Sequence, residues 1–197
     1  MGTWVLREAC RQVRKWQEQT IPAELPLMVS VNLSARQFAQ KDLVDEVGRI
    51  VEETALEPGS LKLEVTESVL MQDPEVAASM LVELAARRVR VCIDDFGTGY
   101  SSLSYLLRFP ASTLKIDRSF VTDMSVGSQH SEMVRTIVVL AHNLGMDVIA
   151  EGVERSDQVR HLQALGCDYM QGYLLSKPVD AAGAEELLKG APLSLGR

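Results

Sequence analysis

The sequence predicts an α/β fold in which parallel strands build a TIM-like (β/α)8 barrel, with about six of the eight strand units present in this chain. Six short apolar segments alternate with segments of helical spacing, and this alternation is typical of α/β architecture. The segments are mostly apolar throughout, as strands covered on both faces are. Successive segments end about 20 to 36 residues apart, which is the size of one strand-plus-helix unit.

The expected elements follow in chain order. A helix carrying Val5, Ala9, Val13 and Trp16 precedes the first strand, at 27 to 33. Short helices are expected over Leu103 to Leu107 and from Asp180 to Lys189. Four apolar stripes predict the remaining helices: Phe38, Leu43, Val44, Val47, Ile50 and Val51; Ala77, Met80, Leu81 and Leu84; Met133, Ile137, Leu140, Ala141 and Leu144; and Val159, Leu162 and Leu165. Asp73 and Pro74 supply an N-cap and a first helical position, and Gly145 and Gly166 supply helix ends.

The domain organisation is expected to be simple, with a single domain over residues 1–190 and a tail over 191–197. A closed barrel needs two more strand units, which we predict to be missing before the first helix. The strand at 27 to 33 would then form an apolar edge, and such edges invite pairing with another chain. We therefore expect this chain to be less stable than a closed barrel, or to be completed by a partner chain.

Composition excludes several classes of function. The net charge is 20 − 27 = −7, which disfavours binding to nucleic-acid polymers. Cys10, Cys92 and Cys167 form no paired motif, which is typical of a reducing compartment, and we expect Cys92 and Cys167 to be buried and inert. Membrane spans and a signal peptide are not expected, so we predict a cytoplasmic domain without membrane contact by this segment.

Asp94 and Asp95, in VCIDDFGTG, are the centre of the predicted site. Neighbouring strand residues point to opposite faces, so both can serve one site only where the strand ends and the chain turns, and residues 96–99 are expected to supply that turn. Such a pair can hold two cations about 3.5–4 Å apart, and oxygen ligands favour Mg²⁺ or Mn²⁺ over zinc. The structural alternative for this pair is a helix N-cap or an Asx turn.

Other polar residues follow the remaining strands. Glu64 and Glu151 come after apolar runs, where an unpaired carboxylate is costly, so we predict metal ligation, with a buried salt bridge to Lys115 as the alternative. Lys115 is expected to position a water or offset phosphate charge, unless it forms a structural pair with Asp117 or Glu151. Asn32 and Gln171 are weaker candidates for ligation and for hydrogen bonding.

Two further predictions concern residues beside the strand ends. Glu67 lies three residues beyond Glu64 and is expected to accept backbone N–H bonds from the loop after Asp95, unless it is an ordinary acid at a helix start. His130, His142 and His161 are expected on helices, away from the site.

Six ordered motifs, VNLSARQF, LEVTES, DDFGTGYSSLSYL, LKIDRSFV, VIAEGVE and QGYLLSKP, closely resemble the EAL domain over nearly the whole chain. That family is the phosphodiesterase of the bacterial second messenger cyclic di-GMP. The resemblance implies a (β/α)8 barrel with one antiparallel strand, and hydrolysis of cyclic di-GMP to linear pGpG with Mg²⁺ or Mn²⁺, as two ions. It also implies a homodimer, and it is compatible with an upstream sensory or GGDEF-type domain.

The resemblance also assigns roles to residues. Glu67 matches a glutamate that steadies the loop after the Asp pair, a loop tied to dimerisation, and Lys115 and Gln171 match residues that hold the catalytic water. Glu154 and Asp117 are expected near the substrate or beside the metal ligands. The implied metal ligands are Asn32, Glu64, Asp94, Asp95 and Glu151.

The name-giving Glu-Ala-Leu motif is absent from this sequence, and it would lie on the second missing strand. Because the other site positions are intact, we interpret the absence as truncation rather than degeneration. The leading hypothesis is therefore an EAL-type phosphodiesterase domain. The alternatives are a cyclic di-GMP binding or regulatory module without turnover, and a dimerising fragment.

Overall fold

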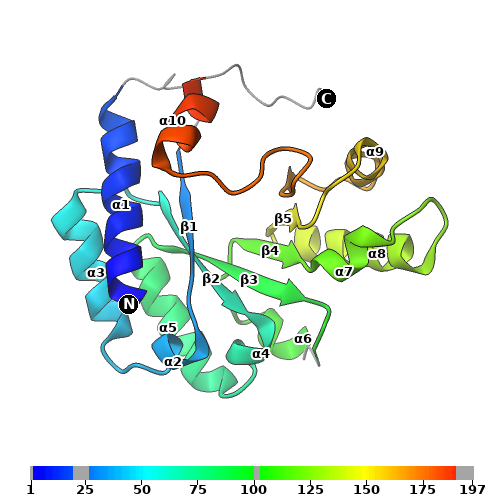
Figure 1. Cartoon of the computed structure of the whole chain (residues 1–197). Helices are drawn as coiled ribbons and strands as arrows, with labels where there is room; N and C mark the ends of the chain where they lie inside the picture. Colours follow the sequence, from blue (N-terminus) through cyan, green and yellow to red (C-terminus); the bar gives the residue numbers. More distant parts are fainter. Residues whose placement is uncertain (1, 20–26, 100–102, 190–197) are drawn as a thin grey trace.

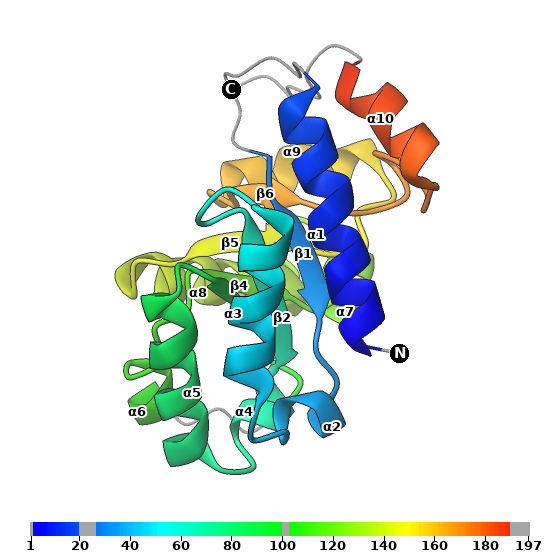
Figure 2. The ribbon, with the colours of Figure 1, turned by 90° about the vertical axis from the view of Figure 1, so that its left-hand side faces the viewer.

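The computed structural model of this chain describes residues 2–19, 27–99 and 103–189. Six parallel strands form one sheet in the order β1 to β6, which confirms the predicted α/β class. The sheet curls into part of a barrel, with helices along its outer side (Figures 1 and 2). The predicted tail, 191–197, lies outside the described residues. The strands are β1 (Val29–Asn32), β2 (Leu61–Thr66), β3 (Arg90–Phe96), β4 (Thr113–Ile116), β5 (Asp147–Ala150) and β6 (Tyr169–Met170).

Most of the helices connect successive strands, whereas α1 precedes β1 and α10 follows β6. Helices α1, α3 and α5 stand side by side near β1 to β3, and α8 packs on β4 and β5 (Figure 1). None of the helices within residues 2–19, 27–99 and 103–189 is both long enough and apolar enough to span a membrane. The helices are α1 (Gly2–Glu18), α2 (Ala35–Phe38), α3 (Leu43–Thr54), α4 (Glu67–Leu70), α5 (Pro74–Ala86), α6 (Leu103–Leu106), α7 (Arg118–Thr122), α8 (Gln129–Asn143), α9 (Ser156–Ala164) and α10 (Ala181–Lys189).

The core lies between the outer face of the sheet and the helices. Leu63 of β2, Leu114 of β4 and Val148 of β5 are fully buried there. The helix stripes that the sequence predicts supply much of the other side, including Val47 and Leu81. Burial of this apolar surface is the main favourable term that holds the helices on the sheet.

Each of two predicted helix faces contains one residue that the structure does not bury, while the rest of each stripe packs on the core. Val5 is 44% exposed, because the buried face of α1 runs through Leu6, Cys10 and the predicted Val13. Met133 of α8 is equally exposed, and Val134 takes the buried position. Both helices carry apolar residues on two adjoining faces, so spacing alone did not decide which face meets the sheet. The prediction for the cysteines is confirmed, since all three thiols are buried and free.

Asp73 is the N-cap of helix α5 and contributes to the stability of this helix. Its side chain accepts a hydrogen bond from Val76 N at 3.3 Å, and Pro74 occupies the first turn. Asp73→Ala should lower the unfolding free energy by about 1 kcal/mol, because it removes the acceptor for one helix N–H. Asp42 is the matched control, since it stands at the N-cap of α3 without a side-chain cap bond. In urea unfolding, an equal loss for Asp42→Ala would contradict this account.

Candidate active site

The concave face of the curled sheet carries polar side chains near the carboxyl ends of the strands. In the parallel register, Glu64 of β2 lies beside Cys92 of β3, which lies beside Thr113 of β4, so all three point to the same face. Two residues further along their strands, Asp94 and Lys115 share that face. Glu64, Asp94 and Lys115 are each less than 9% exposed. The strand ends therefore bring buried charges of both signs into one site.

Asp94 and Asp95 are brought together by a bulge rather than by a turn after the strand. Strand β3 continues to Phe96, but its register with β4 shifts between Ile93 and Phe96. At this shift Asp95 has a positive φ of 53°, and its backbone N–H donates to Asp94 Oδ1 at 3.0 Å. The predicted turn over residues 96–99 is thus not what places both side chains, and a helix N-cap is excluded because both residues belong to β3.

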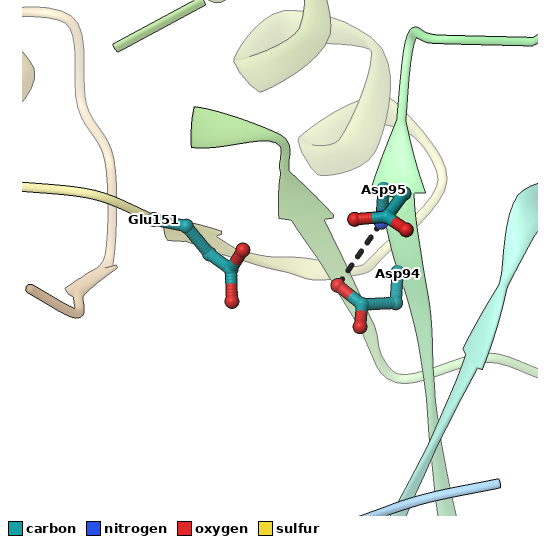
Figure 3. A group of neighbouring side chains, drawn as sticks. All are labelled: Asp94, Asp95 and Glu151. Atoms are coloured by element: carbon teal, nitrogen blue, oxygen red, sulfur yellow. Dashed lines mark hydrogen bonds between the residues drawn. The ribbon is translucent and has the colours of Figure 1, made fainter. Parts of the chain in front are cut away.

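Glu151 completes a group of three carboxylates with this pair (Figure 3). It follows β5, and one ligand oxygen from each of Asp94, Asp95 and Glu151 lies within 4.8 Å of the others. Asp94 is the most buried of the three, and Asp95 and Glu151 are half-buried. Oxygens this close, coming from two strand ends, have the spacing that a bound metal ion requires.

Lys115 forms ion pairs with three of the surrounding carboxylates. Its Nζ lies 2.6 Å from Glu64 Oε2, 2.5 Å from Glu151 Oε1 and 3.6 Å from Asp94 Oδ1. Burial alone would lower the pKa of Lys115, but the hydrogen bonds to Glu151 and Glu64 outweigh it and raise the pKa. The buried salt bridges weighed in the sequence are therefore present, except that Asp117 instead caps α7 through Ser119 N.

The charge balance of the site favours an added cation. Four carboxylates, those of Glu64, Asp94, Asp95 and Glu151, gather near the ammonium of Lys115, which pairs with three of them. Burial is the main reason that the pKa of Asp94 is raised, and the positive charge of Lys115 opposes that effect. Because the available donors are oxygens, a hard divalent cation fits this arrangement. The acidic group can therefore hold a metal ion.

The neutral candidates lie at the two ends of the sheet. Asn32 is the last residue of β1, in register with Glu64, and it is exposed. Gln171 follows β6, and its N–H donates to Ala150 O at 2.8 Å. With Glu151 and Glu154, Gln171 lines a pocket of about 640 Å³. Asn32 is not among the residues that line this pocket.

Arg118 and Tyr173 also line this pocket, and the sequence analysis did not single them out. The side chain of Arg118 starts against Gly152, where an added Cβ would lie 2.7 Å from Arg118 Cβ. Gly152 also has a φ of 72°, which a glycine adopts readily. The glycine between two acids in AEGVE was the sequence signal for this close approach.

Glu67 is buried at the start of α4 and faces the segment after Asp95. Its Oε2 accepts a hydrogen bond from Gly97 N at 3.1 Å, which is the contact expected from the sequence. Gly99 also approaches, because a Cβ added there would lie 3.3 Å from Glu67 Oε1. The three histidines lie on α8 and α9, away from the strand ends, as predicted.

The fold and the site together define an α/β-barrel protein with an acidic, metal-type centre at the carboxyl ends of its strands. More specifically, the chain belongs to the EAL domain family, whose model matches residues 1–178. It is 46% identical over 188 residues to the bifunctional diguanylate cyclase/cyclic di-GMP phosphodiesterase MucR of Pseudomonas aeruginosa, covering 95% of this chain and 27% of that protein. The chain spans about a quarter of the length of the curated relatives it matches.

Solved structures show the same likeness. The PaMucR phosphodiesterase in complex with c-di-GMP matches with a TM-score of 0.88 at 46% identity, covering 93% of this chain and 73% of that one. The EAL domain of Mycobacterium smegmatis DcpA matches with a TM-score of 0.88 at 40% identity, covering 95% of this chain and 83% of that one. The half-barrel described above is thus the EAL fold over nearly the whole chain.

Proposed function

We propose that this domain is a metal-dependent phosphodiesterase that hydrolyses cyclic di-GMP to linear pGpG. The observation that carries the proposal is the convergence of Asp94, Asp95 and Glu151 beside Lys115 at the strand ends. The similarity to MucR, which is named as a cyclic di-GMP phosphodiesterase, supports the substrate. The similarity to the PaMucR structure, which is a complex with c-di-GMP, supports the same substrate.

In this proposal the site binds two metal ions, either Mg²⁺ or Mn²⁺, because hard divalent cations prefer oxygen donors. Bound ions would supply Lewis-acid polarisation of the phosphoryl oxygens and a lowered pKa for attacking water. The residues that would hold them are Asn32, Glu64, Asp94, Asp95 and Glu151.

The remaining site residues would act on water and substrate directly. The ammonium of Lys115 offsets negative charge beside the carboxylates and donates hydrogen bonds there. The Gln171 amide would orient water or phosphate at the pocket wall, and Glu154 would contact substrate in the same pocket. Glu67 would hold the loop after β3 in place by accepting the hydrogen bond from Gly97 N. Asp117 would act beside the pocket by capping α7, whose first residues, Arg118 and Ser119, line the pocket.

The oligomeric state, the cellular location and further domains of the full protein are also proposed. We propose a homodimer and a cytoplasmic location, the latter supported by three free cysteines. Because the curated relatives are about four times longer, a sensory or GGDEF-type domain elsewhere in the full protein is part of the proposal. In this proposal residues 1–190 form one EAL-type domain, and barrel closure requires two further strands.

A second candidate function is a cyclic di-GMP binding module without turnover. Lys115 favours this alternative, because its ammonium pairs with Glu64 and Glu151 and offsets part of their negative charge without any metal ion. A carboxylate that is paired with an ammonium needs a metal ion less than an unpaired one does. Turnover that depends on metal distinguishes the two functions.

The test is hydrolysis of cyclic di-GMP by the purified chain after removal of divalent ions and after addition of Mg²⁺ or Mn²⁺. We expect pGpG to appear only with added metal, because the carboxylates alone repel the phosphodiester. Calorimetric binding of cyclic di-GMP in the same samples identifies the second function. Tight binding with no product under any metal condition would overturn the phosphodiesterase proposal and favour the binding module.

A further inference from the structure

A second cavity lies at the opposite end of the sheet from the acidic site, where strands β2, β3 and β4 begin. Its volume is about 330 Å³, at the lower end of the range of small-molecule pockets. The lining comes from the segments that enter these three strands and from the end of α5. The lining residues are Pro58, Gly59, Ala85, Arg88, Val89, Arg90, Pro110 and Ser112.

The charge of this cavity is positive, in contrast to the chain's net charge of −7. Its charged lining residues are Arg88 and Arg90, and no carboxylate lines it. Across the parts of the chain that the structure describes, neither guanidinium forms an ion pair, whereas Arg87 next to them pairs with Asp45 at 2.7 Å. Two cations without acidic partners at one cavity can receive an anion.

The guanidinium of Arg90 lies over Gly59. A Cβ added to Gly59 would lie 3.7 Å from Arg90 Nε and 3.8 Å from its Nη2. Across the cavity, the hydroxyl of Ser112 donates to Val91 O at 3.3 Å and retains oxygen lone pairs.

Arg88 occupies a backbone position that glycine normally takes. It follows the end of α5 with a φ of 59°, and its N–H donates to Ala85 O at 2.9 Å. The same place is filled by Gly145 after α8 and Gly166 after α9, with φ values of 73° and 83°, but by Ala55 after α3, with a φ of 51°. A side chain in this conformation costs backbone strain, which glycine at this position would relieve.

The plain explanation for Arg88 is that a cation near the end of a helix interacts favourably with the helix dipole. Arg87 already provides a cation there. The dipole also gives no reason for Arg90, which begins β3, to be left without a carboxylate partner.

We propose that this cavity binds the phosphate group of a small phosphorylated molecule. Two guanidinium groups can each offer paired N–H donors to phosphate oxygens, a geometry that lysine cannot reproduce. The volume suits a phosphate or pyrophosphate group with a short remainder rather than a large ligand. This site is independent of the acidic centre, which lies at the other ends of the same strands.

The experiment is calorimetric titration of the whole chain with inorganic pyrophosphate in buffer freed of divalent ions, so that the acidic centre repels the probe. Arg88→Gly removes one guanidinium and relieves the strained φ, so this variant should melt at a higher temperature than the parent while binding pyrophosphate at least about tenfold more weakly. Arg90→Gln should weaken binding similarly. Arg160→Gln, which removes an exposed arginine of α9, is the charge-matched control and should bind like the parent.

Saturable binding that is lost in Arg88→Gly and Arg90→Gln but kept in Arg160→Gln supports the site. Absence of saturable binding by the folded parent would overturn the proposal. An equal loss in all three variants would also overturn it, because it would indicate attraction to overall positive charge rather than to this cavity. Melting curves of each variant establish that a loss of binding is not a loss of fold.

Discussion

Asp94→Asn should reduce metal-dependent hydrolysis of cyclic di-GMP by about 100-fold or more, the scale of losing one preorganised electrostatic group at a reacting centre. Asparagine keeps an oxygen that can accept the hydrogen bond from Asp95 N, so the bulge in β3 should survive. What is lost is one negative charge among the three clustered carboxylates. The measurement is the rate of pGpG formation at saturating Mn²⁺.

The same variant should be at least as stable as the parent. Burial raises the pKa of Asp94, which means that the folded protein disfavours its charged form, and asparagine carries no charge. Asp42→Asn, a change at an exposed helix cap without a side-chain bond, is the control and should keep full activity. Unchanged turnover in Asp94→Asn would show that Asp94 is not a ligand in the reaction.

Lys115→Met should lower the unfolding free energy by about 3–5 kcal/mol in metal-free buffer, the usual cost of removing one partner from a buried ion pair. Glu64 and Glu151 would then be left without their close cationic partner. Adding Mn²⁺ should restore much of this loss, because a ligand that binds only the folded state stabilises it. Urea unfolding with and without metal measures both effects.

Lys62→Met is the matched control, since Lys62 is also buried on the concave face of β2. Within the described part of the chain it forms no ion pair, and burial lowers its pKa, so its charge is not stabilised by folding. Lys62→Met should therefore cost little or stabilise the protein. If Lys115→Met and Lys62→Met behaved alike, or if metal did not restore Lys115→Met, Lys115 would not be the counter-charge of the acidic group.

The sequence predicted the parts of the fold and site that depend on strand periodicity. Parallel strands end at one edge of a sheet, so polar residues after apolar runs were expected together, and Asp94 and Glu151 do meet there. The expected contact between Glu67 and the segment after Asp95 depended on the same reasoning. The roles of these residues in catalysis remain predictions.

Features that depend on local backbone detail or on the choice between two similar faces could not be predicted. The bulge at Asp95 has no sequence signature of its own, so a turn was expected instead. Val5 and Met133 fit a helical stripe as well as their neighbours do. Pairing of Lys115 with Glu64 or Glu151 was an alternative in the sequence analysis, but its pairing with three carboxylates at once depends on distances between residues 21 to 51 positions apart, which spacing along the sequence does not give.

The left-handed backbone of Asp95 restricts which amino acids evolution can place there. The bulge favours glycine, whereas the chemistry proposed for the site requires a carboxylate. Among residues with a side chain, aspartate and asparagine tolerate this conformation best, and glutamate is not among them. Aspartate is the residue type that meets both demands, so a conservative exchange for glutamate at this position would add backbone strain and would also move the carboxylate group.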